Sequence, residues 1–221
     1  NEALILELDG DNQPFDNRQF FYRGKQRNAK VWCIDSQKQE PKDSLWYFAT
    51  NVPLSQPGLT VEWEVKNPAD AVPNVDPTDL QWVIASSSID QRWAQGLKSK
   101  IEQGLHVLWV LDRLDPNDNG KQFEAIWKSW FPDDSIEISE GGSKKFHLFE
   151  SIDMTHPVFT AFADPKFNDF TKIRFWHHRS IRGVTGTPWK VSAKFDDQDP
   201  AMLERSLGKG KVTVLAAGWQ P

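Results

Sequence analysis

The stretch "QGLHVLWVLDRLD" (Gln103 to Asp115) decides how the chain is organised. Gly104 ends a helical pattern, residues 106–111 form a compact apolar run, and a polar loop begins at Asp112. A short apolar run between a helix-stopping glycine and a polar loop is typical of a strand that is buried on both faces. We therefore predict an α/β domain in which this strand belongs to a parallel sheet flanked by helices.

Strand and helix patterns alternate on both sides of this stretch. Strands that alternate with helices predict a parallel sheet with right-handed crossovers. Only residues 59–65 alternate strictly between apolar and polar side chains, which indicates one wet face and an edge position. An edge position for the second strand is a feature of the flavodoxin-like order 2-1-3-4-5. The predicted strands are 29–35, 59–65, 79–87, 106–111 and 211–217, and the predicted helices are 40–52, 88–104 and 123–130.

Two other segments depart from this alternation. Residues 1–28 contain two strand-like runs joined by a turn-rich polar loop, and we interpret them as a β-hairpin left from a preceding β-sandwich domain. The α/β domain then spans 29–221, with a β-rich insertion or antiparallel extension at about 135–195. Because the chain begins and ends in strand patterns, we expect it to be a segment of a longer polypeptide.

Composition narrows the possible classes of protein. A hydrophobic content of 38% in 221 residues is enough for the core of one large domain. The net charge of −5, with basic residues scattered among acidic ones, argues against a nucleic-acid surface. No apolar run approaches the roughly 18 residues of a transmembrane helix. The single cysteine, Cys33, excludes internal disulfides and any multi-cysteine metal site.

The fold class itself predicts where a ligand would bind. In an open α/β sheet, ligands bind beyond the carboxyl ends of the strands, at the point where the strand order reverses. For the order 2-1-3-4-5, this crevice lies between the first and third strands. The candidate ligand-binding residues at the ends of these strands and of the fourth strand are Asp35, Ser36, Ser86, Ser87, Asp112 and Arg113.

The order of several motifs resembles a known family. The run from Asp79 to Asp112 resembles class I glutamine amidotransferase-like domains. The whole chain resembles the periplasmic part of bacterial aerotolerance-type membrane proteins, which have an N-terminal double-transmembrane region and often a von Willebrand factor A-like domain. The motifs are "DGDNQPFDNRQFFYRG" (9–24), "THPVFTAF" (155–162) and "LGKGKVTVLAAGWQP" (207–221). The resemblance implies a periplasmic domain of an inner-membrane protein, whose partners are other domains of the same polypeptide or envelope proteins.

The sequence departs from true amidotransferases at the nucleophile. Their cysteine follows the strand that corresponds to 107–111, where this chain has Asp112 and Arg113 and no cysteine, serine or threonine. The small residues that permit a strained nucleophile turn are also missing. Cys33 lies inside a predicted strand, where we expect it to pack in the core rather than react. We therefore expect no catalytic residue of the amidotransferase type.

The histidines and acidic loops predict neither a metal site nor a cofactor. His177 and His178 are adjacent, so they would point to opposite faces of a strand. His156 precedes a proline and is expected to shape a turn, while His106 and His147 stand alone in the sequence. The acidic segments 115–119 and 195–200 do not match the pattern of a calcium loop, so we interpret them as solvated loops.

These observations predict a non-catalytic binding or scaffolding domain. The first alternative is a hydrolase that uses Asp112 or a bound metal at the switch-point crevice, although a lone carboxylate makes a poor catalyst. The second alternative is a glycan-binding module, because eleven tryptophans could supply stacking platforms. The second alternative requires tryptophan rings exposed in one groove, whereas the phase of most tryptophans with other apolar residues favours core packing.

Overall fold

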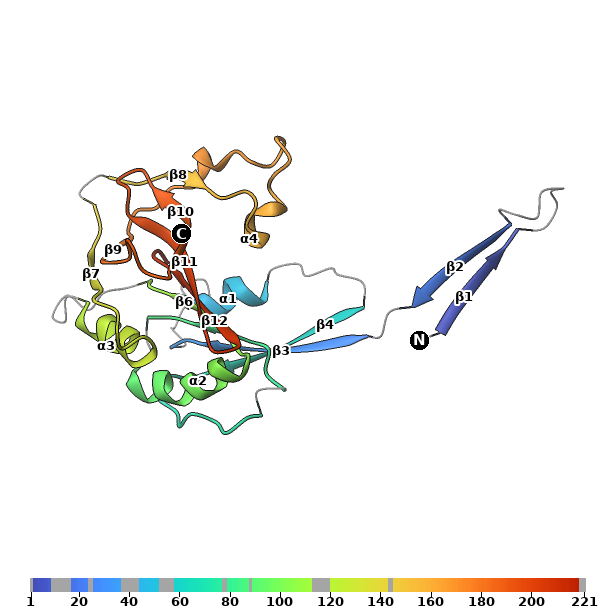
Figure 1. The fold of residues 1–221 in the computed structure, drawn as a ribbon, viewed down its shortest axis with the longest axis horizontal. Helices are drawn as coiled ribbons and strands as arrows, with labels where there is room; N and C mark the ends of the chain where they lie inside the picture. Colours follow the sequence, from blue (N-terminus) through green and yellow to red (C-terminus); the bar gives the residue numbers. More distant parts are fainter. Residues whose placement is uncertain are drawn as a thin grey trace.

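The computed structural model describes residues 2–8, 17–23, 26–36, 44–51, 58–76, 79–87, 89–112, 120–142 and 145–218. Its centre is an eight-stranded sheet in the order β4-β3-β5-β6-β12-β11-β10-β8 (Figure 1). Helices flank this sheet, so the architecture is mixed α/β, as the alternation of patterns predicts. The strands of this sheet are β3 (Arg27–Ile34), β4 (Leu59–Lys66), β5 (Trp82–Ala85), β6 (His106–Val110), β8 (Phe149–Ile152), β10 (Lys190–Phe195), β11 (Pro200–Leu207) and β12 (Gly210–Leu215).

One half of the sheet is parallel. β3 pairs in parallel with β4 and β5, and β6 pairs in parallel with β5 and β12. The second strand of the α/β part, β4, lies at the edge as predicted, and its first residues alternate between exposed and half-buried. The last four residues of β3 are buried, because this strand has a neighbour on each side.

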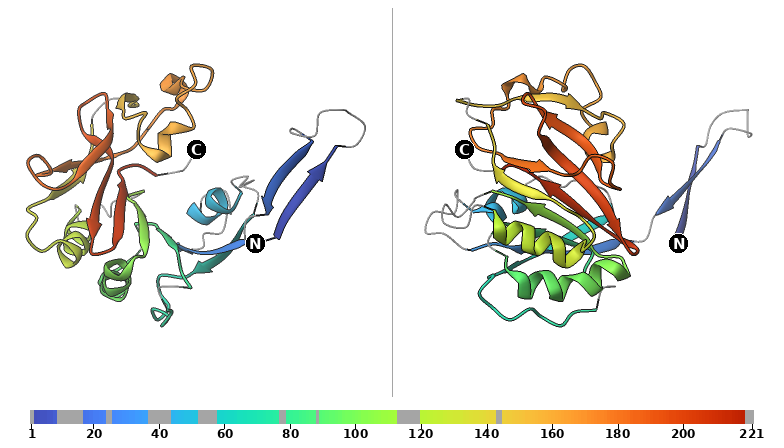
Figure 2. Two further views of the ribbon diagram at one scale, coloured as in Figure 1. Left: turned by 45° about the vertical axis from the view of Figure 1, so that its right-hand side comes forward. Right: turned by 60° about the vertical axis from the view of Figure 1, so that its left-hand side comes forward.

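The two faces of the parallel half are covered by different helices (Figure 2). On one face, α2 (Gln91–Gln103) and α3 (Lys121–Trp130) pack through apolar stripes that form the larger core cluster. The side chain of Asp90 begins α2 by accepting hydrogen bonds from the amides of Arg92 and Trp93. On the other face, α1 (Leu45–Thr50) packs in a smaller cluster, where Leu45 and Ala49 lie with Cys33 and Val110.

The other half of the sheet is antiparallel and corrects one expectation. The order 2-1-3-4-5 predicts that the last strand, 211–217, ends the sheet, but β12 lies between β6 and β11 in its interior. β11, β10 and β8 continue the sheet as antiparallel neighbours. A separate pair, β7 (Glu137–Glu140) and β9 (Arg179–Arg182), is also antiparallel. The short helices α4 (Pro157–Thr160) and η2 (Phe170–Lys172) lie between β8 and β9.

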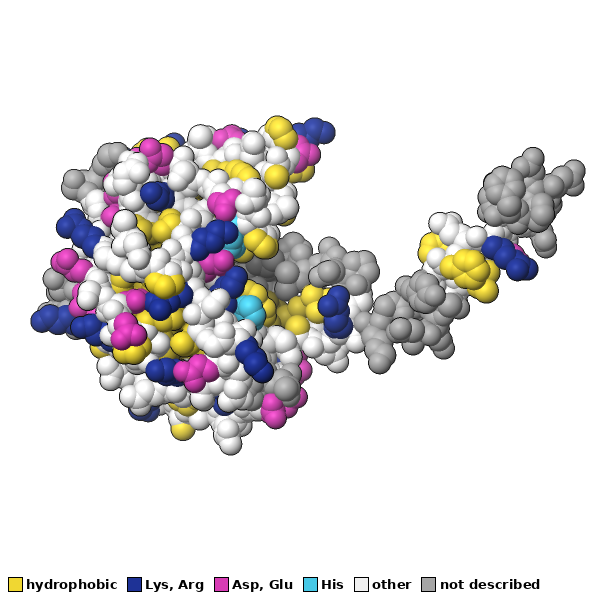
Figure 3. All heavy atoms as spheres, in the orientation of Figure 1, with side chains coloured by type: hydrophobic (Ala, Val, Ile, Leu, Met, Phe, Trp, Pro, Cys, Tyr) yellow, Lys and Arg dark blue, Asp and Glu magenta, His cyan; other side chains and the backbone are white. Residues whose placement is uncertain are grey.

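The first residues form a hairpin that projects away from the α/β body (Figure 1). β1 (Glu2–Glu7) pairs antiparallel with β2 (Arg18–Arg23). Figure 3 shows apolar side chains on the visible face of this hairpin. The exposed large apolar residues of this segment are Leu4, Ile5, Leu6, Leu8, Phe20 and Phe21. The origin of the hairpin in a β-sandwich stays a prediction.

The surface of the described residues shows the mixture of basic and acidic side chains that the sequence predicts. Figure 3 shows basic and acidic side chains interspersed over the visible face of the α/β body, without a continuous basic stripe on that face. Among the described residues, no helix has both the length and the apolar composition that a bilayer-spanning helix requires.

Candidate functional sites

The predicted crevice residues lie at the carboxyl edge of the parallel strands, where hydrogen bonds hold several of them. Asp35 follows β3 and is buried, and its Oδ2 accepts a hydrogen bond of 2.6 Å from the amide of Leu45. This carboxylate therefore fixes the start of α1. Ser86 is also buried, and its amide donates a 3.0 Å hydrogen bond to the carbonyl of Ile34. Ser36, which follows Asp35, is half-buried.

Asp112 holds the neighbouring strand end. Its Oδ1 accepts a 2.9 Å hydrogen bond from the amide of Ser87, and its carbonyl accepts a 2.8 Å bond from Nη2 of Arg179. The structure thus brings Ser87 and Asp112 together, as the topology predicts. Arg113 lies outside the described residues. Ligand binding at this edge stays a prediction, and the contacts seen there join strand ends and loops.

Arg179 is a buried residue of this edge that sequence reasoning missed. Its side chain is 4% exposed, and Nη1 lies 2.5 Å from Oε2 of Glu140. Through these contacts, the first residue of β9 is tied to β7 and to the end of β6. A buried arginine with a carboxylate partner indicates a structural or binding role. The sequence pattern of β9 does not reveal that Arg179 contacts Glu140 and the carbonyl of Asp112, because these residues belong to other strands and loops.

Cys33 lies in the core, as predicted. Its side chain is fully buried, and burial, helped by the charge of Asp35, raises the pKa of its thiol to about 12. A nucleophilic cysteine needs the opposite environment, one that favours the thiolate and admits a substrate. Cys33 therefore acts as a small apolar side chain.

The structure also assembles a cluster of histidines and aspartates in its antiparallel half. His147 precedes β8, His178 precedes β9, and Asp197 lies in the turn between β10 and β11. One potential ligand atom from each of these three residues lies within 4.8 Å of the others. Both histidines are at most 2% exposed, and their ring centroids are 4.5 Å apart. We call these three residues the His–Asp cluster.

Two further carboxylates surround the His–Asp cluster. Nδ1 of His147 lies 2.7 Å from Oδ1 of Asp196 and 3.5 Å from Oδ2 of Asp197. Nε2 of His178 lies 3.1 Å from Oδ2 of Asp197 and 3.4 Å from Oδ2 of Asp199. Yet Nε2 of His147 and both ring nitrogens of His178 are buried without a hydrogen-bond partner in the described structure.

Electrostatics around His178 favour the neutral ring. Burial lowers the pKa of His178, and the neighbouring His147 acts in the same direction, although the charges of Asp197 and Asp199 oppose them. A neutral imidazole has one ring nitrogen free to accept a proton or to ligate a metal. The arrangement of two imidazoles and an aspartate matches the donor set that proteins use for zinc and similar ions.

The His–Asp cluster corrects two interpretations of the sequence. We expected His147 to stand alone, but the pairing of residues 147 and 175 brings it beside His178. We also expected residues 195–200 to be only a solvated loop, whereas Asp197 contacts His178. The expected separation of the adjacent histidines is confirmed, since the side chain of His177 is 79% exposed and that of His178 is 1% exposed. The acidic segment 115–119 lies outside the described residues.

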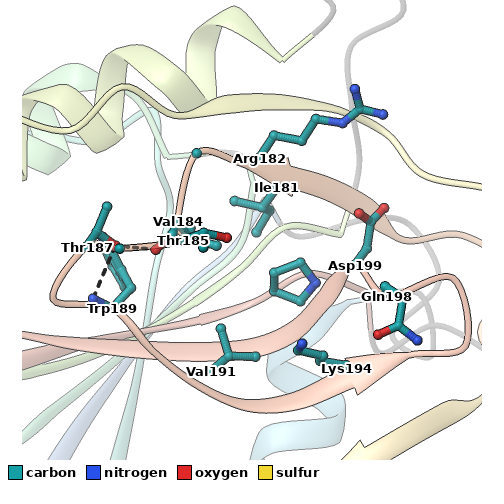
Figure 4. Close-up of a pocket in the computed structure, with 13 residues that line it drawn as sticks. Ile181, Arg182, Val184, Thr185, Thr187, Trp189, Val191, Lys194, Gln198 and Asp199 are labelled. Atoms are coloured by element: carbon teal, nitrogen blue, oxygen red, sulfur yellow. Dashed lines mark hydrogen bonds between the residues drawn. The ribbon is translucent and has the colours of Figure 1, made fainter.

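A hollow of about 380 Å³ is lined in part by Asp199 (Figure 4). Because Asp199 also contacts His178, the hollow lies beside the His–Asp cluster. One wall is the end of β9 with the turn at 183–187, and the other is formed by β10 and the turn that follows it. Arg182, Lys194 and Gln198 make the lining polar, and Trp189 adds an aromatic wall. The hollow is open to solvent.

Most tryptophans with a described environment serve packing. Six are buried in the core, while Trp82 is 42% exposed and Trp176 is 47% exposed. Trp82 stacks on His106 at a centroid distance of 5.2 Å, and Trp176 meets the edge of Phe146. The six buried tryptophans are Trp32, Trp93, Trp109, Trp127, Trp130 and Trp189.

Comparisons with known proteins place the fold. No protein-family model and no curated protein sequence matches this chain. The solved structure of cytoplasmic protein STM3548 from Salmonella typhimurium is similar, with 12% identity, a TM-score of 0.58, and coverage of 87% of this chain and 89% of that one. Cytoplasmic protein STM1381 from Salmonella typhimurium LT2 is similar over the same shares, at 11% identity and a TM-score of 0.57.

A third similarity covers only part of a larger protein. The chain aligns with 28% of Gan42B, a GH42 β-galactosidase, at 9% identity and a TM-score of 0.47. At these identities, the two Salmonella structures support a shared α/β fold and no more.

Proposed function

We propose that this chain is a non-catalytic binding domain built on a flavodoxin-like fold of the amidotransferase type. The strand order β4-β3-β5-β6-β12 supports the flavodoxin-like arrangement, since it corresponds to 2-1-3-4-5 in the α/β part. The observation that carries the proposal is the hydrogen bond between Asp112 and the amide of Ser87. The carboxylate that follows β6, where amidotransferases present their thiol, holds a loop in place here.

The remaining groups at this edge favour the same conclusion. The carboxylate of Asp35 is engaged by the amide of Leu45, and the only thiol of the chain is buried with its pKa raised to about 12. Residues 113–119 contain no cysteine, serine or threonine that could replace it. A catalytic edge needs groups whose reactive atoms are free to meet a substrate, whereas these groups stabilise loops.

An exposed apolar surface supports a binding role. Several large apolar side chains of the segment 158–176, which contains α4 and η2, are between 42% and 65% exposed. Exposed apolar side chains of this size are a feature of protein–protein contact sites. We propose that the partners are other domains of the same polypeptide or envelope proteins, and that the parent is an inner-membrane protein with this domain in the periplasm, as the family resemblance implies. The side chains are Val158, Phe162, Phe167, Ile173 and Trp176.

Site-specific photo-crosslinking in the intact parent tests the binding role. A photoreactive phenylalanine analogue at Phe162 or Phe167 should give one dominant crosslinked product. The matched control is the same analogue at Gln95, an exposed position on the outer face of α2. Equal labelling from all three positions would contradict a specific contact at the apolar surface.

The hydrolase alternative requires Asp112 to act as a catalytic carboxylate rather than to hold a loop. If Asp112 were the catalytic carboxylate, Asp112→Asn would abolish the hydrolysis of glutamine or of simple esters by the purified chain. We expect no turnover above buffer for either the natural chain or the variant. Turnover that disappears in Asp112→Asn would overturn the non-catalytic assignment.

The glycan alternative depends on Trp82 and Trp176. Stacking on a sugar would quench or shift tryptophan fluorescence during titration with oligosaccharides, and the change would be lost in Trp82→Ala or Trp176→Ala. We expect no saturable change, because Trp82 is already stacked on His106 and Trp176 already packs against Phe146.

A further inference from the structure

We propose that His147, His178 and Asp197 bind a divalent transition-metal ion of the zinc class, with Asp199 placed to act as a fourth donor. This metal site goes beyond the binding role proposed above and does not depend on it. The site lies in the antiparallel half of the sheet, where three segments distant in sequence meet.

The donor atoms are the first argument. Two imidazoles and one carboxylate are common zinc ligands, and their potential ligand atoms lie within 4.8 Å of one another. Buried polar atoms are nearly always hydrogen-bonded, yet Nε2 of His147 has no such partner and its side chain is 3% exposed. Both ring nitrogens of His178 are also buried without a hydrogen-bond partner. A bound cation would satisfy one nitrogen of each ring, Nε2 of His147 and Nε2 of His178.

The spacing of the donors is the second argument. Zinc bonds of about 2.0–2.1 Å in a tetrahedron place neighbouring ligand atoms about 3.3 Å apart. Oδ2 of Asp197 and Oδ2 of Asp199 lie 3.1 Å and 3.4 Å from Nε2 of His178. These contacts lack the alignment of hydrogen bonds. They have the separation of two donors that share a metal.

The surroundings of His147 supply the third argument. Metal-ligating histidines typically donate their other ring N–H to a carboxylate, which fixes the tautomer and the orientation of the ring. Nδ1 of His147 lies 2.7 Å from Oδ1 of Asp196. A proton held at Nδ1 leaves the lone pair on Nε2, the atom that has no hydrogen-bond partner. Asp196 is therefore a positioning residue for His147.

The main chain closes over the cluster because two glycines stand there. A Cβ at Gly142 would lie 2.0 Å from Nε2 of His147 and 3.0 Å from Oδ2 of Asp197. A Cβ at Gly141 would lie 2.3 Å from Nε2 of His178. Only glycine lets the backbone pack this closely against both rings. The enclosure limits access of water to the donors, which strengthens their hold on a cation.

A metal ion here would tie together the residues before β8, the residues before β9 and the β10–β11 turn. Asp199 also lines the adjacent hollow, so the ion would fix one wall of that hollow. The competing interpretation is a metal-free network in which the histidines and aspartates form ion pairs. The metal site predicts that one equivalent of added metal binds at these side chains, whereas the metal-free network predicts no such binding.

Metal titration of the complete 221-residue chain separates them. The protein is stripped with a chelator and titrated with Co²⁺, whose visible absorption is strong in a tetrahedral site, and then with Zn²⁺ in competition with a chromophoric chelator. We expect one equivalent of metal to bind with micromolar or tighter affinity. His147→Ala, His178→Ala and Asp197→Asn should each lower the zinc affinity more than about 100-fold, and Asp196→Asn about 10–100-fold.

His177→Ala is the matched control, since His177 adjoins His178 but is exposed. This variant should bind zinc as the natural chain does. Circular dichroism of each metal-free variant reports whether it is folded, and Asp197→Asn, which preserves side-chain shape, keeps the test valid if a histidine variant unfolds. The proposal is overturned if no saturable one-to-one binding occurs, or if folded Asp197→Asn binds zinc like the natural chain. It is equally overturned if His177→Ala loses binding as the cluster variants do.

Discussion

Asp134 connects three parts of the α/β body through one buried carboxylate. It follows α3 and is 7% exposed. Its Oδ2 accepts hydrogen bonds from Nε1 of Trp127 at 3.0 Å and from Nε1 of Trp189 at 2.7 Å. Its Oδ1 lies 2.6 Å from Nη1 of Arg205 on β11. Removal of this carboxylate should therefore weaken the junction between α3 and the antiparallel half of the sheet.

The size of the effect follows from the partners. A hydrogen bond to a charged group contributes about 1.5–3 kcal/mol, and removing one member of a buried ion pair costs about 3–5 kcal/mol. Arg205 is 21% exposed at its side chain and recovers some hydration, whereas the two indole N–H groups are buried. We therefore expect Asp134→Ala to lower the free energy of unfolding by about 3–5 kcal/mol. Asp134→Asn keeps one acceptor, and its expected loss is about 1.5–3 kcal/mol.

The loss should also depend on pH. Burial disfavours the ionised Asp134, but the hydrogen bonds from Trp189, Trp127 and Arg205 outweigh it and lower the pKa of this carboxyl. A carboxyl whose pKa is lower in the folded state stabilises the fold above its unfolded pKa of about 3.9. That stabilisation disappears as the pH falls through the folded pKa. The difference between the natural chain and Asp134→Asn should therefore shrink below pH of about 4.

Urea unfolding followed by circular dichroism measures these changes without relying on the tryptophans themselves. The control is Asp133→Ala, which removes the adjacent exposed aspartate and should change the unfolding free energy by less than about 0.5 kcal/mol. A loss below about 1 kcal/mol for Asp134→Ala at pH 7 would refute the assignment of Asp134 as a stabilising junction.

Three further predictions concern single side chains. Cys33 should react with a thiol reagent roughly 1,000-fold more slowly than a free cysteine until the chain unfolds, because its pKa of about 12 leaves little thiolate; rapid labelling of the folded chain would contradict its burial. Asp90→Ala should lower the unfolding free energy by about 1 kcal/mol, because the first amides of α2 lose their acceptor; an unchanged urea midpoint would be inconsistent with this cap. Hydrogen bonds from Lys66 and Lys30 lower the pKa of Glu64 to about 2. Glu64→Gln should therefore lower the unfolding free energy by up to about 1 kcal/mol at pH 7, and this loss should vanish as the pH falls from about 4 to 2. A loss that is the same at both ends of this range would exclude the ion pair as its cause.

The sequence predicts where the residues of the sheet edge lie but not which groups they contact. The topology rule placed Asp35, Ser87 and Asp112 at the carboxyl edge of the sheet, because strand order follows from the pattern of strands and helices. It could not show that backbone amides occupy the carboxylates of Asp35 and Asp112. Those bonds depend on how each loop leaves its strand, and loop geometry has no periodic signal.

The sequence alone determined the parallel α/β half, the edge position of β4 and the burial of Cys33. These features depend on local periodicity, because a strand covered on both faces must be apolar throughout and an edge strand with one wet face must alternate. Only the tertiary structure decided that β12 lies inside the sheet and that His147, His178 and Asp197 meet. These residues are up to 50 positions apart in sequence. Antiparallel pairing brings them together through backbone hydrogen bonds, and because such bonds do not depend on the identity of the side chains, the sequence does not specify which segments pair.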